Sequence, residues 1–274
     1  MCQKLKILRG LLRQSGLFAG VLVLLMGAPV LGGEDGGGGD GSDAQREKLE
    51  EFIGWLLDTD DRVLANVRFA DVVKAATGRE VRRFDPEDPV DAEVMAGLSE
   101  AFDVVFADIR REDHPVHAVG RINEVSGVIE DLVFDAIGRQ SGFSSTWPLN
   151  ARGHVQRSGY PDIRIVHDAS GRVYYLDPKV YREGSERSGF RTFYFEPRVE
   201  TNKILDDAAH LIMGIAHRGR RGEVWEFAEW SLVDLVDFRV RLKAEFQASN
   251  REMYAPEGLR LRGGRLGGNS EEGR

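Results

Sequence analysis

The chain has 274 residues, of which 42% are hydrophobic and 30% are charged. This composition excludes a mini-protein that depends on disulfides, a collagen-like chain and a wholly disordered chain. With 37 Lys and Arg against 45 Asp and Glu, the formal net charge of −8 excludes a globally basic nucleic-acid binder. Cys2 is the only cysteine, so the body of the chain can form neither a disulfide nor a thiolate metal site.

Residues 1–33 have the three parts of a secretory signal peptide. Basic residues come first, an apolar run over 17–26 follows, and small residues lead up to position 33. The apolar run is short for a helix that spans a membrane. We therefore expect a cleaved signal peptide and a secreted, periplasmic or cell-envelope protein, with an uncleaved anchor as the alternative. If the start codon is misassigned, we expect a cytoplasmic protein.

Acidic residues are concentrated just after this segment. Residues 34–61 contain ten Asp and Glu against two Lys and Arg, a net charge of −8, so the remainder of the chain is close to balance. Residues 34–43 combine glycine with acidic residues and predict a flexible linker. At the other end, residues 255–274 are rich in Gly, Arg and Glu and predict a disordered tail.

The segment 44–112 has helical spacing and carries no chemistry that we recognise. After a first helix, the pattern predicts a second over about 62–76, which Gly78 ends. Residues 85–89 contain two prolines and predict a turn, after which Asp91 is expected to cap a third helix. The apolar stripe of this third helix is expected to be buried, and consists of Val94, Leu98, Ala101, Phe102, Val105 and Ile109.

The segment 113–254 mixes helical and strand patterns. A helix over 118–138 precedes two strand-like runs, Tyr160–Val166 and Val173–Leu176, which turn residues at 168–171 join into a hairpin. Further elements are expected as a strand over 191–195, a helix over 201–217 and one or two strands between 224 and 246. The predicted fold class is therefore α+β, a mixed β-sheet flanked by helices with an N-terminal helical region.

The hairpin brings two acidic residues together. Asp162 opens the first strand and Asp177 lies on the returning strand, so a turn near 168–171 places the two carboxylates side by side. Neighbouring carboxylates raise each other's pKa unless a cation lies between them, and hard divalent cations prefer such oxygen ligands. Lys179 lies two residues beyond Asp177 and shares its face of the strand. This combination suits metal-assisted hydrolysis of phosphodiesters.

The Pro-Asp pair that ends at Asp162 and the Asp-Pro-Lys run that begins at Asp177 resemble the motif of the PD-(D/E)xK nuclease superfamily, the fold of many restriction endonucleases. The order of elements over 118–236 is similar to the common core of that superfamily. The resemblance implies that Asp162 and Asp177 bind magnesium, with manganese as the alternative, and that Lys179 places the attacking water. It also implies a metal contact from the backbone carbonyl of Pro178, because proline lacks only the N–H group. Pro178 is also the one departure, since proline is unusual inside an internal strand.

Members of this superfamily also tend to carry a glutamate on the helix that precedes the hairpin. Glu130 fits this position best, and the resemblance implies that it lies near the metal. Glu124 is the alternative, because position along the helix alone does not separate the two. The simplest other interpretation of either glutamate, and of Asp131, is a solvated surface carboxylate.

The charge around the hairpin suits a polyanion. Residues 152–203 contain ten Lys and Arg against seven Asp and Glu, a local net charge of +3 in an acidic protein. We therefore expect nucleic acid as the partner, with DNA favoured over RNA, and identify no protein partner. The sequence thus predicts a magnesium-dependent endonuclease whose catalytic residues are Asp162, Asp177, Lys179 and Glu130. The alternative is an exported, non-catalytic binding module that keeps the nuclease-like fold.

Overall fold

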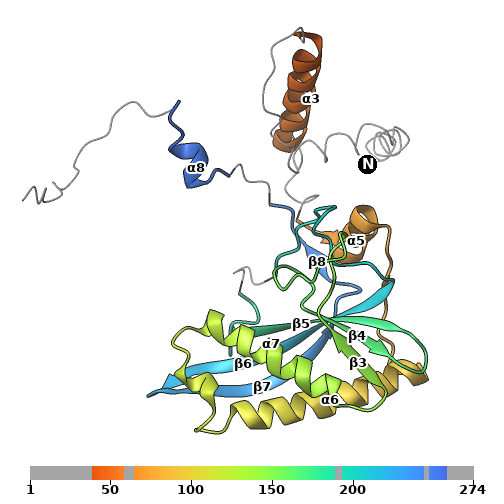
Figure 1. Cartoon of the computed structure of the whole chain (residues 1–274), viewed down its shortest axis with the longest axis vertical. Coiled ribbons are helices and arrows are strands. Elements are labelled where there is room, and N and C mark those ends of the chain that lie inside the picture. Colours follow the sequence, from red (N-terminus) through yellow and green to blue (C-terminus); the bar gives the residue numbers. More distant parts are fainter. Residues whose placement is uncertain (1–38, 59–64, 189–192, 244–246, 258–274) are drawn as a thin grey trace, which may run out of the picture. The chain divides into compact units, whose positions relative to one another are not determined.

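The computed structural model (Figure 1) describes residues 39–58, 65–188, 193–243 and 247–257. The signal peptide predicted over 1–33 and all but three residues of the predicted tail lie outside these ranges. No helix among the described residues has the length and apolar character needed to cross a membrane. The chain divides into two units, residues 1–241 and 242–274, of which the second contains the short helix α8 (Asn250–Met253).

The first unit is built on a mixed sheet of six strands. They are β2 (Val81–Arg82), β3 (Phe143–Thr146), β4 (Ile163–His167), β5 (Val173–Arg182), β6 (Ala208–Arg221) and β7 (Val224–Asp234). The order is β2-β6-β5-β4-β3, with β7 also paired to β6. Strand β6 runs parallel to β2 and β5, and the other pairs are antiparallel. The α+β fold class with a mixed sheet is therefore confirmed.

Two helices, α6 (Pro89–Ile109) and α7 (Ile122–Gly138), cover one face of the sheet (Figure 1). A short 3-10 helix, η1 (Pro115–Ala118), lies between them in the chain. The apolar stripe predicted for α6 is buried at all six positions. It joins one hydrophobic core with alternate residues of the central strands, namely Ile163, Ile165, Tyr174, Leu176, Ala209, Leu211, Met213 and Ile215.

The opposite face of the sheet has a smaller hydrophobic cluster. It contains Phe69 and Val73 of α5 (Phe69–Thr77), which pack with Tyr160, Tyr175 and other apolar residues. Because side chains alternate along a strand, Asp177 and Lys179 share this face with Tyr175, away from α6 and α7. One face of the sheet therefore carries the larger core, and the other carries a smaller apolar cluster together with these charged groups.

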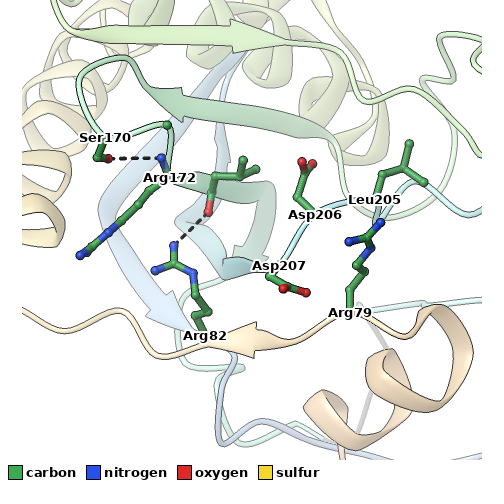
Figure 2. Close-up of a pocket in the computed structure, with 9 residues that line it drawn as sticks. Arg79, Arg82, Ser170, Arg172, Leu205, Asp206 and Asp207 are labelled. Carbon is green, nitrogen blue, oxygen red and sulfur yellow. Dashed lines mark hydrogen bonds between the residues drawn. The ribbon is translucent and has the colours of Figure 1, made fainter.

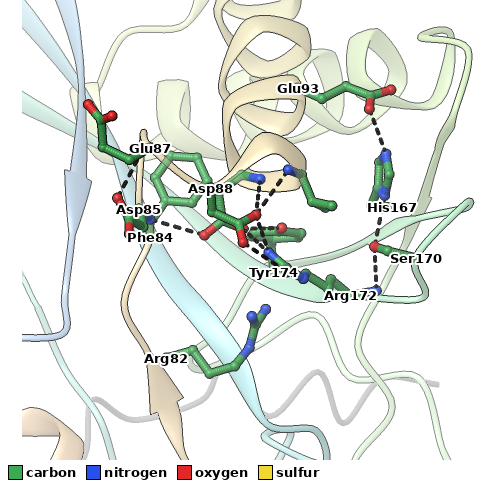
Figure 3. Close-up of polar contacts among 12 residues, drawn as sticks. Arg82, Phe84, Asp85, Glu87, Asp88, Glu93, His167, Ser170, Arg172 and Tyr174 are labelled. Carbon is green, nitrogen blue, oxygen red and sulfur yellow. Dashed lines mark hydrogen bonds and ion pairs between the residues drawn. The ribbon is translucent and has the colours of Figure 1, made fainter.

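The predicted cap of α6 is wrong by three residues. Asp88, not Asp91, is the N-cap, and its carboxylate accepts hydrogen bonds from the backbone N–H groups of Val90 and Asp91 at 2.9 and 3.1 Å. Pro89 fits the first helical position because its fixed φ suits a helix and its missing N–H needs no partner there. Figure 3 shows that Asp88 also faces the guanidinium of Arg172.

Two elements predicted after the hairpin are also wrong. The segment predicted as a helix over 201–217 contains most of β6, which is buried on both faces along most of its length. Its apolar run therefore lacks the alternation that marks a half-exposed strand. Of the strand predicted over 191–195, the described residues 193–195 have no regular structure, and two of them, Phe193 and Phe195, pack edge-on against Phe69.

The region predicted as purely helical contains two short strands. One is β2, which joins the main sheet, and the other is β1 (Val67–Arg68), which pairs with β8 (Arg239–Val240). Helix α5 therefore begins later than predicted, although Gly78 ends it in the left-handed conformation with a φ of 74°. Helix α3 (Gly39–Asp58) begins inside the predicted linker, of which residues 34–38 lie outside the described ranges.

Candidate active site

The register of the β4–β5 hairpin sets the position of the two predicted acidic ligands. Ile163 pairs with Leu176 in an antiparallel ladder, so the residues next along each strand, Asp162 and Asp177, lie beside each other. The Nζ atom of Lys179 is 2.5 Å from Oδ2 of Asp177 and 3.5 Å from Oδ2 of Asp162. The structure thus brings these three predicted residues together on one face of the sheet.

The two acidic residues of this cluster are buried, whereas its lysine is partly exposed to solvent. Asp162 and Asp177 are buried, whereas 32% of the Lys179 side chain is exposed. Burial, reinforced by the neighbouring Asp162 carboxylate, raises the pKa of Asp177 well above its usual value. Burial alone would lower the pKa of Lys179, but the charges of Asp177 and Asp162 raise it overall. Lys179 therefore stays protonated at neutral pH.

The donor set of this cluster fits a hard divalent cation. Oδ2 of Asp177 is buried and makes no hydrogen bond of good geometry with the described residues, although it forms an ion pair with the Lys179 ammonium at 2.5 Å. A buried carboxylate oxygen without a hydrogen bond, beside a second carboxylate, favours a cation that binds oxygen. Among the described residues no three His, Cys, Asp or Glu side chains lie close enough together to hold a metal ion. Further ligands would therefore have to include backbone carbonyls or water.

Glu130 lies within electrostatic reach of this cluster. Its side chain, on α7, is largely buried, and burial followed by the charge of Asp162 raises its pKa, while Lys179 and Arg157 lower it. A guanidinium nitrogen of Arg157 is 3.8 Å from the Glu130 carboxylate and 2.8 Å from that of Asp131. The alternative residue, Glu124, is exposed in the first turn of α7. Of the two glutamates, Glu130 is therefore the one near the acid pair.

The position of Pro178 explains how β5 tolerates a proline. Strand β4 pairs with β5 only as far as Leu176, whereas the pairing with β6 continues through Pro178 to Arg182. At Pro178, β5 therefore has no partner in β4 and is an edge on that side, and proline is accepted at edges.

Lys203 is a residue of the site that the sequence analysis counted only as a basic residue. It is 2% exposed, and its Nζ donates a hydrogen bond to the carbonyl oxygen of Gln156 at 3.2 Å. Burial lowers the pKa of Lys203 to about 8, while the carboxylates of Asp162, Asp177 and Glu130 act in the opposite direction. Lys203 thus places a second amine near the acid pair. Lys203 belongs to no recognisable motif. Because residues 201–217 were incorrectly predicted as a helix, the sequence did not indicate that Lys203 lies near the acid pair.

Two cavities lie near the β4–β5 hairpin. The smaller, of about 380 Å³, is lined by Arg79, Arg82 and Arg172 together with Asp206 and Asp207 (Figure 2). Part of this charge is already paired, since Asp206 accepts two hydrogen bonds from Arg164 and Arg172 contacts Asp88. The larger, of about 640 Å³, is lined by Trp147, Lys203 and nine other residues. Neither cavity includes Asp162 or Asp177.

Two comparisons place the chain among known proteins. The family model described as the Type II restriction enzyme MjaV family matches residues 64–257. The Type II restriction enzyme MjaV of Methanocaldococcus jannaschii is 28% identical over 218 residues, which cover 76% of this chain and 92% of the relative. The family match includes every strand of both sheets and the helices α5, α6 and α7.

Proposed function

The chain belongs to the Type II restriction enzyme MjaV family, and from this premise we propose that it is an endonuclease that hydrolyses phosphodiester bonds within DNA. The observation that carries the proposal is the cluster of Asp162, Asp177 and Lys179 on one face of the sheet. The spacing of these residues and the order of strands and helices around them also support membership of the PD-(D/E)xK superfamily.

We infer that Asp162, Asp177 and the carbonyl oxygen of Pro178 hold a magnesium or manganese ion, with Glu130 close by. When bound, such an ion would polarise a phosphoryl oxygen and lower the pKa of a coordinated water. The burial of Asp177 beside a second carboxylate and its raised pKa support this assignment, because a divalent cation would favour its charged form.

Lys179 would act as a donor of hydrogen bonds. Its pKa is raised, so the amine is protonated at neutral pH and is a poor general base. An ammonium at the exposed edge of the acid pair can orient the attacking water and stabilise negative charge that develops on the phosphate. Because the Lys179 side chain is partly exposed, the scissile phosphate can reach the cluster from the solvent side of Lys179.

Cleavage of supercoiled plasmid tests the proposal. We expect the wild-type protein to nick or linearise plasmid with Mg²⁺ and to lose this activity with a chelator. Asp162→Asn and Lys179→Met should each slow cleavage about a hundredfold or more. Asp168→Asn is the matched control, because Asp168 is an exposed aspartate at the far end of the same hairpin.

The outcomes separate an enzyme from a binding module. Cleavage that survives both Asp162→Asn and Lys179→Met would contradict this assignment of the site. DNA binding by the wild type without cleavage in Mg²⁺ or Mn²⁺ would favour a non-catalytic module.

A second pair of variants tests Glu130. Glu130→Gln should weaken cleavage, whereas Asp131→Asn should leave it near the wild-type rate, because only Glu130 is coupled to Asp162 and Lys179. Both residues contact Arg157, so the comparison removes the effect of losing that contact. Equal rates for the two variants would place Glu130 outside the active site.

A further inference from the structure

The proposed cleavage reaction does not use the larger cavity. One wall includes Phe134 and Trp147, whose rings stack on each other at a centroid distance of 4.1 Å and an interplanar angle of 6°. The guanidinium carbon of Arg157 lies 3.7 Å from the Trp147 ring centroid, so Phe134 and Arg157 already cover the faces of this ring. Leu149 and Val155 also line the cavity and remain 44% and 61% exposed, so it is open to solvent on their side. The volume of about 640 Å³ lies in the range of small-molecule sites.

The rest of the lining is polar. Tyr175 donates its hydroxyl proton to the Asp206 carboxylate at 2.8 Å, and that carboxylate accepts two further hydrogen bonds from Arg164. Lys203 and the exposed Thr146 add an amine and a hydroxyl. A ligand that fits this cavity therefore combines apolar surface, which would contact Leu149 and Val155, with hydrogen-bonding groups at its edge.

The cavity lies directly beside the acid pair. Arg164 and Tyr175 pair across the hairpin, and Asp162 and Asp177 lie two residues farther along the same strands on the same face. Two residues of a strand span about 7 Å. Lys203 connects the two places, because it lines the cavity and is electrostatically coupled to both aspartates.

We propose that this cavity receives one nucleobase of the DNA substrate, turned out of the helical stack beside the phosphodiester that is cleaved. The inference rests on the proposed function, since it needs DNA at the acid pair. A base turned out of a duplex is held by stacking or apolar contact and by hydrogen bonds to its edge. The apolar wall and polar lining supply both kinds of contact.

Other occupants fit less well. An aliphatic side chain would make no use of the Lys203 ammonium, which donates one hydrogen bond to Gln156 and has further N–H groups, or of the Thr146 hydroxyl. A phosphate could bind the Lys203 ammonium, but its charged oxygens would then lie against the apolar side chains of Trp147 and Leu149. A planar base with polar edges matches both sides and already belongs to the substrate.

Leu149 offers a matched pair of variants to test this inference. It is partly exposed at the cavity, so Leu149→Trp should block the opening and Leu149→Ala should widen it, and both should fold. Fragment ends from wild-type cleavage would first give the cut position. Duplexes carrying the fluorescent base 2-aminopurine at single positions around that cut would then be bound to the Lys179→Met protein with Mg²⁺.

We expect 2-aminopurine fluorescence to rise on binding at one position, and the rise to disappear when Leu149→Trp is added. In the otherwise wild-type protein, Leu149→Trp should slow cleavage of intact duplex by at least about tenfold. An abasic site at the bright position should restore that rate, because no base then has to enter the cavity. Leu149→Ala, which widens the opening and removes only part of the apolar contact, should slow cleavage of intact duplex less than Leu149→Trp does.

The results distinguish failure of the cavity from failure of the nuclease. A wild-type protein that cleaves DNA, with no bright position and with Leu149→Trp equally active, overturns the base site and leaves the proposed function intact. A fluorescence rise that persists in Leu149→Trp also overturns it, because the base then goes elsewhere. Absence of cleavage by the wild type overturns the proposed function itself. If Leu149→Trp unfolds by circular dichroism, Val155→Trp provides the same block from a more exposed position.

Discussion

Asp91 and Asp177 are buried to a similar degree, at 2% and 1% exposure, but their surroundings differ. Asp91 accepts hydrogen bonds from the Tyr174 hydroxyl at 2.5 Å, from Arg172 at 3.2 Å and from the backbone N–H of Asp85 at 3.0 Å. Asp177 has a second carboxylate, that of Asp162, as its neighbour, and one of its own oxygens makes no hydrogen bond with the described residues.

Asp91 is a structural carboxylate, and Asp177 is the one that we propose as functional. Around Asp91 the donors outnumber the acids, and Figure 3 shows this network joining the start of α6 to the hairpin through Asp88 and Arg172. Around Asp177 a second carboxylate lies beside the Lys179 ammonium, and burial disfavours the charged form of Asp177 until a further cation binds. Burial alone therefore does not indicate the role of a carboxylate. The number of hydrogen-bond donors and neighbouring acids around it is more informative.

The largest effect should follow from neutralising the functional carboxylate. We expect Asp177→Asn to slow DNA cleavage about a thousandfold, because a metal contributes several kcal/mol to the transition state and each 1.36 kcal/mol is tenfold in rate. The same change removes a buried group whose charged form is disfavoured, and Lys179 keeps Asp162 as a partner, so the metal-free protein should be at least as stable as the wild type. Single-turnover cleavage and urea unfolding measure the two effects. Strong destabilisation by Asp177→Asn would contradict the comparison.

The structural carboxylate should behave in the opposite way. Asp91→Asn should lower the free energy of unfolding by about 3 kcal/mol, because it weakens several buried hydrogen bonds to charged or hydroxyl donors. It should leave the affinity for Mg²⁺ unchanged. Glu100→Gln, an exposed position on the same helix, is the control. Urea unfolding checks the stability, and loss of Mg²⁺ binding without loss of stability would reverse the roles assigned to the two aspartates.

The position of the proposed metal-binding pair was easier to predict than the structural network. Asp162 and Asp177 could be placed together because alternating Ile163 and Ile165 fix the face of the first strand and the turn at 168–171 fixes the register. The Asp91 network could not be predicted, because its partners Arg172 and Tyr174 lie more than 80 residues away along the chain. The local sequence around Asp91 does not indicate which distant side chains will donate hydrogen bonds to α6.

Divalent cations should stabilise the wild type and not the variant that lacks the functional carboxylate. At a Mg²⁺ concentration a hundred times its dissociation constant, mass action adds about 2.7 kcal/mol to the free energy of unfolding. Asp91→Asn should keep this increment and Asp177→Asn should lose most of it. Because a ligand carboxylate must be deprotonated, the increment should shrink as the pH falls toward the raised pKa of Asp177. Thermal unfolding with and without Mg²⁺ tests this, and an equal shift in all three proteins would argue against binding at Asp177.

The residues around the acid pair show where sequence patterns stop being informative. Strand β6 was predicted as a helix because burial on both faces removes the alternation of polar and apolar residues. That error also hid Lys203, whose importance comes only from the fold that buries it near Asp162. Glu130 and Glu124 were separable only once the position of α7 on the sheet was known.

The smallest effect is a pH dependence of the structural network. The hydrogen-bonded ion pair with Arg172, followed by the backbone N–H of Asp91, lowers the pKa of Asp88 from its usual 3.8 to about 2. Because the folded-state pKa is lowered, the contribution of Asp88 to stability is fully present above the unfolded pKa and is lost as the pH falls through about 2. Asp88→Ser keeps a side chain able to cap α6 but cannot pair with Arg172.

The difference in the free energy of unfolding between the wild type and Asp88→Ser should therefore be constant near neutral pH and shrink between pH 4 and 2. Chemical unfolding across this range measures it. A difference that stays constant to pH 2 would show that the cap, not the ion pair, is what Asp88 contributes. Measured in the Asp177→Asn background, the same shrinkage should recur unchanged, since the two carboxylates belong to separate clusters, and a coupled response would break the distinction between them.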